Sequence, residues 1–169
     1  MIRTGSVRIA LLVGSLSAMP ACHSRAQVDR TTESIAGCYL LTWQPWSVGE
    51  SKPDSAWQTP DIEHRVWLTG TPIAIRAPQP WLVVRPAPGE KASTFGDVRW
   101  TWNDATRQVV IEWDATMAGV RLTLSAQDSK QSLVQNLTGA AKWWSTDTPV
   151  PPGLTALVHA SRETCTVPD

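Results

Sequence analysis

The sequence predicts an all-β protein with a single domain, most simply a small antiparallel barrel of about eight to ten strands joined as an up-and-down meander. The main evidence is residues 98–125, VRWTWNDATRQVVIEWDATMAGVRLTLS, where apolar and polar residues alternate in three successive runs. Side chains on a strand point alternately to opposite faces, so one face of this meander is apolar. Its residues are Val98, Trp100, Trp102, Val109, Ile111, Trp113, Val120, Leu122 and Leu124. A two-sheet sandwich is the alternative.

The same short period recurs through the rest of the chain, and no segment has a convincing helical period. The predicted strands cover residues 39–43, 62–68, 73–76, 81–85, 98–102, 109–113, 120–124, 133–137, 139–145 and 155–164. Proline cannot donate to a strand ladder, so Pro78 and Pro80 indicate edge strands or bulges nearby. The segment 45–60, PWSVGESKPDSAWQTP, is expected to be a loop in which Trp46 and Trp57 are exposed.

Residues 1–21 are typical of an export signal: basic Arg3 and Arg8 precede the short apolar run IALLVGSL. Two cleavage sites compete. Ala21-Cys22 resembles a bacterial lipoprotein signal, with Cys22 as the lipid attachment site, whereas Ser24-Arg25-Ala26 suits ordinary cleavage after Ala26. We therefore expect an exported protein, either anchored in the bacterial cell envelope or periplasmic or secreted. Residues 22–33 form the expected flexible tether, and residues 34–169 form the domain.

The charge of the expected mature chain excludes one class of partner. Without Arg3 and Arg8, the 15 basic residues become 13 against 15 acidic ones, a formal charge of −2. Neither a basic patch nor a charge run stands out, so nucleic acid is not an expected partner. After the signal, no second apolar run is long enough for a membrane-spanning helix, so a lipid anchor would be the membrane contact.

The cysteines predict a disulfide. If Cys22 is lipidated, Cys38 and Cys165 remain as a pair in an oxidising compartment. Cys38 adjoins the start of the first predicted strand and Cys165 the end of the last, and these strands become neighbours when a meander closes into a barrel. In a sandwich they need not be neighbours. The predicted bond is structural, because the sequence contains no C-x-x-C motif.

The ends of the domain resemble those of lipocalin and calycin barrels. In that family a glycine and an aromatic residue open the first strand, and an arginine near the end of the last strand packs across the aromatic side chain. Gly37, Tyr39 and Arg162 match this pattern, with tyrosine in place of the usual tryptophan. The resemblance implies a barrel whose end is closed by Tyr39 and Arg162. The chain also resembles uncharacterised exported bacterial proteins that open with Gly-Cys-Tyr and close on one cysteine.

The titratable residues do not predict an enzyme, a metal site or a cofactor. His64 is expected on an apolar strand face beside Ile62 and Val66, and His159 on the solvated face. Neither belongs to a recognisable metal-ligand pattern. Two carboxylate pairs, Asp61 with Glu63 and Glu112 with Asp114, are expected to face away from the apolar side and into solvent.

Tryptophan is the unusual feature of the composition, with 10 residues against a single tyrosine and a single phenylalanine. Trp100, Trp102 and Trp113 share the apolar face, where they either fill the core or line a cavity for a small hydrophobic ligand. Trp143 and Trp144 are expected on opposite faces. The sequence thus favours a non-enzymatic, lipocalin-like cup. The alternative is a solid-cored envelope module that contacts a protein or a glycan through its outer face and the 45–60 loop.

Overall fold

The computed structural model describes residues 30–49, 59–74, 80–103, 105–126 and 133–166. This part of the chain contains one short helix, α1 (Arg30–Ile35), and nine strands. The strands are β1 (Gly37–Trp43), β2 (Ser47–Val48), β3 (Arg65–Pro72), β4 (Leu82–Pro86), β5 (Asp97–Asn103), β6 (Gln108–Asp114), β7 (Ala118–Ala126), β8 (Asn136–Ser145) and β9 (Leu154–Glu163). The all-β prediction is confirmed.

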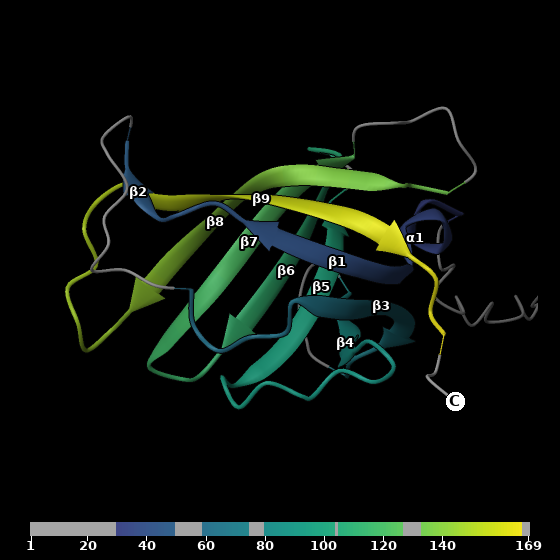
Figure 1. The fold of residues 1–169 in the computed structure, drawn as a ribbon, viewed down its shortest axis with the longest axis horizontal. Helices are drawn as coiled ribbons and strands as arrows, with labels where there is room; N and C mark the ends of the chain where they lie inside the picture. The colour runs from purple at the N-terminus through teal and green to yellow at the C-terminus, as the bar shows by residue number, and fades with distance from the viewer. Residues whose placement is uncertain (1–29, 50–58, 75–79, 104, 127–132, 167–169) are drawn as a thin grey trace, which may run out of the picture.

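Eight of these strands close into an antiparallel barrel (Figure 1). Neighbours follow the order β1-β3-β4-β5-β6-β7-β8-β9, and β9 pairs with β1 from Cys38↔Glu163 to Trp43↔Val158. The barrel is therefore the fold, and the sandwich alternative is wrong. Helix α1 lies at one end of the barrel, and β2 lies at the opposite end as a ninth strand paired with β9 (Figure 1).

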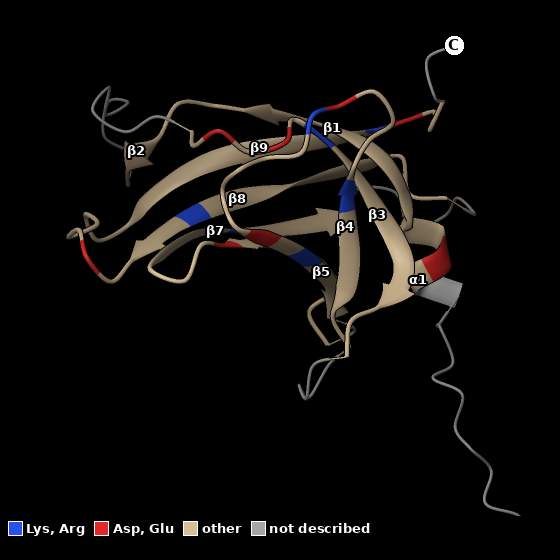
Figure 2. Ribbon diagram, turned by 90° about the horizontal axis from the view of Figure 1, so that it is seen from below, with Lys and Arg blue, Asp and Glu red and all other residues tan. Residues whose placement is uncertain are grey.

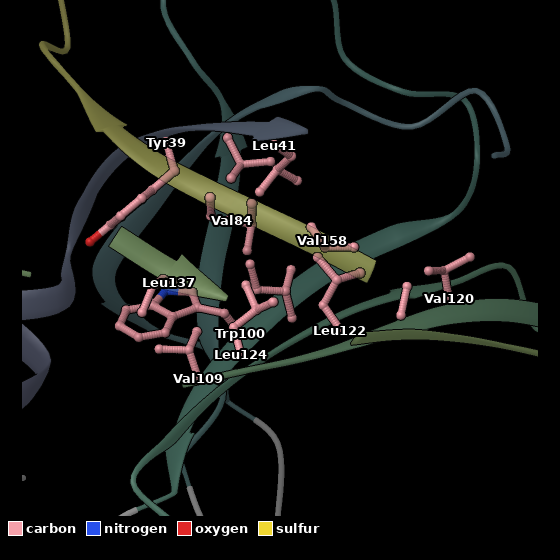
Figure 3. Close-up of a cluster of buried hydrophobic side chains, with 14 of the residues drawn as sticks. Tyr39, Leu41, Val84, Trp100, Val109, Val120, Leu122, Leu124, Leu137 and Val158 are labelled. Carbon is pink, nitrogen blue, oxygen red and sulfur yellow. The ribbon is translucent and has the colours of Figure 1, made fainter. Parts of the chain in front are cut away.

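The predicted apolar face of the meander is the inner wall of the barrel. Seven of its nine residues are buried, and Val98 and Trp102 are partly buried against them. Figure 3 shows several of these side chains pointing toward one another from different strands, together with Tyr39, Leu41, Leu137 and Val158. Close-packed burial of this kind is the dominant favourable contribution to folding. Three small residues on β8 and β9, Ala141, Ala156 and Ala160, are buried in the same core.

Three predicted strands have different bounds in the structure. The strand expected at 62–68 begins only at Arg65, and residues 62–64 precede it in irregular conformation. Strict alternation therefore fails there: Glu63 is buried and His64 is exposed, the reverse of the prediction. The strands expected at 133–137 and 139–145 are replaced by one continuous strand, β8, because Thr138 and Gly139 remain in the ladder; residues 133–135 precede it and are not in a strand.

The N-terminal tether was expected to extend to residue 33, yet residues 30–33 belong to α1. The helix has only six residues, too few for a hydrophobic period to emerge. Its stability comes from packing, since Ile35 is fully buried in the core. The proposed signal, Cys22 and Ala26 lie outside the described residues, as does Trp57 within the 45–60 segment.

A bulge between β1 and β2 carries Trp46 into the barrel. From Trp43 to Ser47 the chain advances four residues, whereas the facing stretch of β9, Val158 to Thr155, advances three. One extra residue reverses which side chains face inward, so Trp46 points into the core. It is 1% exposed, and the prediction of an exposed Trp46 is wrong.

Candidate binding site at the aromatic end of the barrel

The end of the barrel next to α1, here called the closed end, is held by Arg162. Its Nε donates to the Val134 carbonyl at 2.7 Å, and its Nη2 lies 2.8, 3.1 and 3.0 Å from the carbonyl oxygens of Ser34, Ile35 and Ala36. The carbonyls that end a helix lack intrahelical donors, and a cation there also suits the helix dipole. Arg162 thus fastens the end of α1 to β9.

Tyr39 completes this closed end. It is the register partner of Arg162, and its hydroxyl accepts from Arg162 Nη2 at 3.1 Å while lying 2.8 Å from the Ile35 oxygen. The guanidinium also lies 5.2 Å from the centre of the tyrosine ring. A Cβ on Gly37 would collide with the same guanidinium, so glycine permits this approach. The structure therefore brings together the three residues on which the lipocalin resemblance rests.

Burial raises the pKa of Tyr39 above its ordinary value of 10.0, although the positive charge of Arg162 and its hydrogen bond act in the opposite direction. Desolvation penalises the phenolate more than the guanidinium stabilises it. The hydroxyl therefore remains a neutral donor at physiological pH, as its contact with the Ile35 carbonyl requires.

Cys38 and Cys165 form a disulfide, which confirms the predicted bond. Their Cα atoms are 5.4 Å apart, and the bond joins positions separated by 127 residues. It links the start of β1 to the segment that follows β9, next to the ladder that closes the barrel.

The middle of the barrel is filled by two of the three tryptophans predicted to line a cavity. Trp100 and Trp113 are 0% exposed, so no water-sized space touches them, and this favours the core interpretation for both. Their indole N–H groups donate to the Thr69 carbonyl at 2.9 Å and to the Glu63 carboxylate at 2.7 Å. Trp102 is partly buried against the core.

Four other rings gather at the opposite end of the barrel, which we call the aromatic end: Trp43, Trp46, Phe95 and Trp143. The ring centres of Trp43 and Trp46 are 6.4 Å apart, those of Trp46 and Trp143 are 6.3 Å apart, and those of Phe95 and Trp143 are 5.5 Å apart. These tilted and edge-on geometries are favourable for aromatic pairs. Trp46 is buried, whereas the other three are partly buried, so the cluster reaches from the core to the surface.

Two indole N–H groups in this cluster lack an acceptor. The Nε1 atoms of Trp43 and Trp46 are buried and make no hydrogen bond. A buried unsatisfied donor costs about 1–3 kcal/mol, which is why such groups are rare in folded proteins. An indole N–H can only donate, so only a group with an acceptor atom relieves this cost.

A buried carboxylate adjoins the cluster. Glu63 is 5% exposed, and its two oxygens accept from Trp113 Nε1 at 2.7 Å and from the backbone N–H of Ser93 at 2.9 Å. The Ser93 hydroxyl in turn accepts from the N–H of Phe95 at 2.8 Å. Both donors to Glu63 are neutral, and no ion pair joins it to another residue in the described ranges.

Two hollows are relevant to binding. One, of about 380 Å³, lies beside the aromatic end within the β8–β9 connection and is bordered by Trp143, Val150, Pro151 and Leu154. Ligand pockets have volumes of roughly 300–1,000 Å³, so this hollow falls at the small end of the range. The other, of about 550 Å³, lies on the outer wall over β1, β8 and β9. It is lined by Thr42, Gln44, Thr138, Gly139, Ala140, Leu157, Val158 and His159.

The outer wall also carries a charged network that the sequence suggested would be solvated. Glu112 is only 4% exposed because Arg99 and Arg121 cover it, at 2.8 and 2.7 Å. Arg99 also pairs with Asp114 at 3.2 Å and lies over the Trp81 ring. Figure 2 shows basic and acidic positions interspersed over the strands, with this group on β5 and its neighbours. Opposite charges that lie side by side on adjacent strands stabilise the sheet, so this network has a structural role.

Sequence reasoning missed the aromatic end. Trp43 was placed correctly in the first strand, but its cluster depends on the bulge that turns Trp46 inward and on the irregular segment that buries Glu63. The available signal was the density of tryptophan around Pro45, a residue that cannot donate to the neighbouring strand.

Comparison with known proteins assigns no family: no protein-family model, no curated protein and no solved structure matches the chain. Within the described residues, no helix has the length and apolar character needed to cross a membrane. Nor do those residues bring together three or more histidine, cysteine or carboxylate side chains that could hold a metal ion.

Proposed function

We propose that this protein is an exported, lipid-anchored binding protein without catalytic activity, a lipocalin-like cup for a small hydrophobic ligand. The observation that carries the proposal is the contrast between the two ends of the barrel. Hydrogen bonds from Arg162 and Tyr39 hold the closed end, whereas rings and a neighbouring hollow form the aromatic end. Concave, aromatic-lined sites of this kind suit apolar ligands.

This proposal changes the expected lining of the cup. Trp100 and Trp113 belong to the packed core, so the ligand binds beyond them, in the hollow that Trp143 borders. An anchor at Cys22 would be attached eight residues before Arg30, the first residue of α1. Helix α1 itself lies at the closed end (Figure 1).

A native mass spectrum of the full chain, expressed with its own leader and extracted gently from membranes, tests the anchor and the cup together. The expected mass begins at an acylated Cys22, includes one disulfide and carries a bound small molecule. Equilibrium dialysis of the neutral dye N-phenyl-1-naphthylamine, with the same detergent on both sides, then measures binding directly. We expect saturation at one dye molecule per chain.

Two matched variants locate the dye. Trp143→Leu removes a ring of the aromatic end and should weaken dye binding at least tenfold. Trp81→Leu removes a ring from the outer wall, next to Arg99, and should leave binding unchanged. Circular dichroism verifies that both variants fold. Absence of saturable dye binding to the folded wild-type chain would overturn the cup.

The second candidate function is the solid-cored envelope module, and the outer hollow favours it. Leu157 is 57% exposed in that hollow, beside Gln44 and His159. Under this proposal a protein or glycan of the envelope contacts the outer wall. Leu157→Lys should then abolish that contact, whereas Trp143→Leu should preserve it.

A further inference from the structure

The unpaired indole N–H donors at the aromatic end indicate which class of ligand would bind there. Of the buried indoles, Trp100 and Trp113 have protein acceptors, whereas Trp43 and Trp46 have none. Both residues belong to the segment that contains the bulge, and the centres of their rings are 6.4 Å apart. A ligand that enters from the hollow bordered by Trp143 and brings an oxygen acceptor to these N–H groups supplies what the protein lacks.

The flat surfaces around these donors indicate the body of the ligand. Trp46 meets Trp143 at an interplanar angle of 82°, and Trp143 meets Phe95 at 45°. A ring system bound against the accessible parts of Trp143 and Phe95 makes face and edge contacts with both. An apolar ring that bears one oxygen therefore fits both the walls and the donors.

Glu63 determines the charge that this end tolerates. Its carboxylate is buried, bonded to neutral donors, and connected to the Phe95 backbone through Ser93. Where water is excluded, like charges repel strongly because the effective dielectric constant is low. An anionic ligand would also lose its own hydration on entry. The same pocket that accepts a carbonyl oxygen thus disfavours a carboxylate.

We propose that the ligand is an uncharged, ring-bearing molecule whose carbonyl oxygen accepts hydrogen bonds from Trp46 and Trp43, and that Glu63 excludes its anionic analogues. This inference rests on the proposed cup and specifies its ligand class. It separates neutral ketones and esters from fatty acids and other carboxylates, which an apolar cup alone would not distinguish.

Three probes with one ring system provide the test: 2-acetylnaphthalene, 2-ethylnaphthalene and 2-naphthoate. They offer a neutral acceptor, no acceptor and an anionic acceptor. Their affinities for the full chain are measured by competition with N-phenyl-1-naphthylamine in dialysis. We expect 2-acetylnaphthalene to bind at least tenfold more tightly than either of the other two.

Two substitutions assign the effect to its source. Trp46→Phe keeps a ring and removes one of the two N–H donors, so it should reduce the preference for acetyl over ethyl while changing ethyl binding less than threefold. Glu63→Gln should strengthen naphthoate binding at least fivefold. Glu112→Gln removes a buried carboxylate on the outer wall instead and should not alter it.

The outcomes separate this inference from the proposed function. Equal binding of the acetyl and ethyl probes would mean that the two N–H groups bond to water and not to the ligand's carbonyl oxygen. Binding of naphthoate as tightly as the ketone would refute the role of Glu63. Failure of all three probes to displace a bound dye would also refute this ligand class. In each case dye binding still supports the cup. If the dye does not bind, both proposals fail.

Discussion

Replacing Arg162 with alanine should destabilise the barrel more than any surface arginine does. The Nε–H and two Nη2–H groups give three charge-assisted hydrogen bonds to the closed end. Such bonds contribute about 1.5–3 kcal/mol each when buried, and Arg162 is only partly buried, so we expect a loss of about 3–4 kcal/mol. Most domains have a total stability of about 5–15 kcal/mol, so the variant should fold but unfold at a much lower urea concentration.

Arg65→Ala is the matched control. Arg65 pairs with Glu163 at 3.1 Å, one position along β9 from Arg162, but its side chain is 50% exposed. Exposed ion pairs contribute about 0–1 kcal/mol, so this change should have little effect. Arg162→Lys keeps the positive charge but lacks the planar guanidinium with its several donors, so it should recover only part of the lost free energy of unfolding. Equal unfolding midpoints for Arg162→Ala and Arg65→Ala would refute the assigned role.

Three further predictions concern stability. Reducing the Cys38–Cys165 bond should cost about 5 kcal/mol in the chain-entropy model, measured by urea unfolding with and without reductant. The raised pKa of Tyr39 means that its contribution to stability is complete below pH 10 and is lost as the pH rises through the pKa of the folded protein, because the unfolded state releases its proton first. The fall in stability at alkaline pH should therefore be smaller in Tyr39→Phe. Glu112→Gln should cost about 1–2 kcal/mol by leaving Arg99 and Arg121 without their shared partner, and added salt should reduce this cost.

The tyrosine prediction has an independent optical test, since Tyr39 is the only tyrosine in the chain. The phenolate absorbs in the near ultraviolet, so a spectrophotometric titration reports this residue alone. Its midpoint should lie above 10.0 in the folded protein and return to the ordinary value in urea. A midpoint at or below 10.0 in the folded protein would contradict the dominance of burial.

Alternation along the strands made the barrel predictable. In β9 a period of two places Ala156, Val158 and Ala160 on one face, and all three are buried. The disulfide followed from closure, because a meander that closes makes its first and last strands neighbours. These inferences needed only regular geometry, which the sequence pattern encodes directly.

The candidate site was not predictable in the same way because it arises where regularity fails. The extra residue between Trp43 and Ser47 and the irregular segment before Arg65 each change which side chains face inward. A change of one residue in register moves a side chain to the other face of the sheet, and no local pattern marks where that change occurs. Trp46 and Glu63 were therefore assigned to solvent although both are buried.

The two ends of this barrel use their buried polar groups in opposite ways. At the closed end, the donors of Arg162 and Tyr39 form hydrogen bonds with carbonyl oxygens of the protein itself. At the aromatic end, Trp43 and Trp46 present donors without acceptors. If the proposed ligand binds here, a donor that the protein leaves unpaired stabilises the complex by more than an ordinary hydrogen bond does, because binding also removes the cost of its burial. Under that proposal, the folding cost of these two indoles contributes to affinity and selectivity for a ligand that brings an oxygen to them.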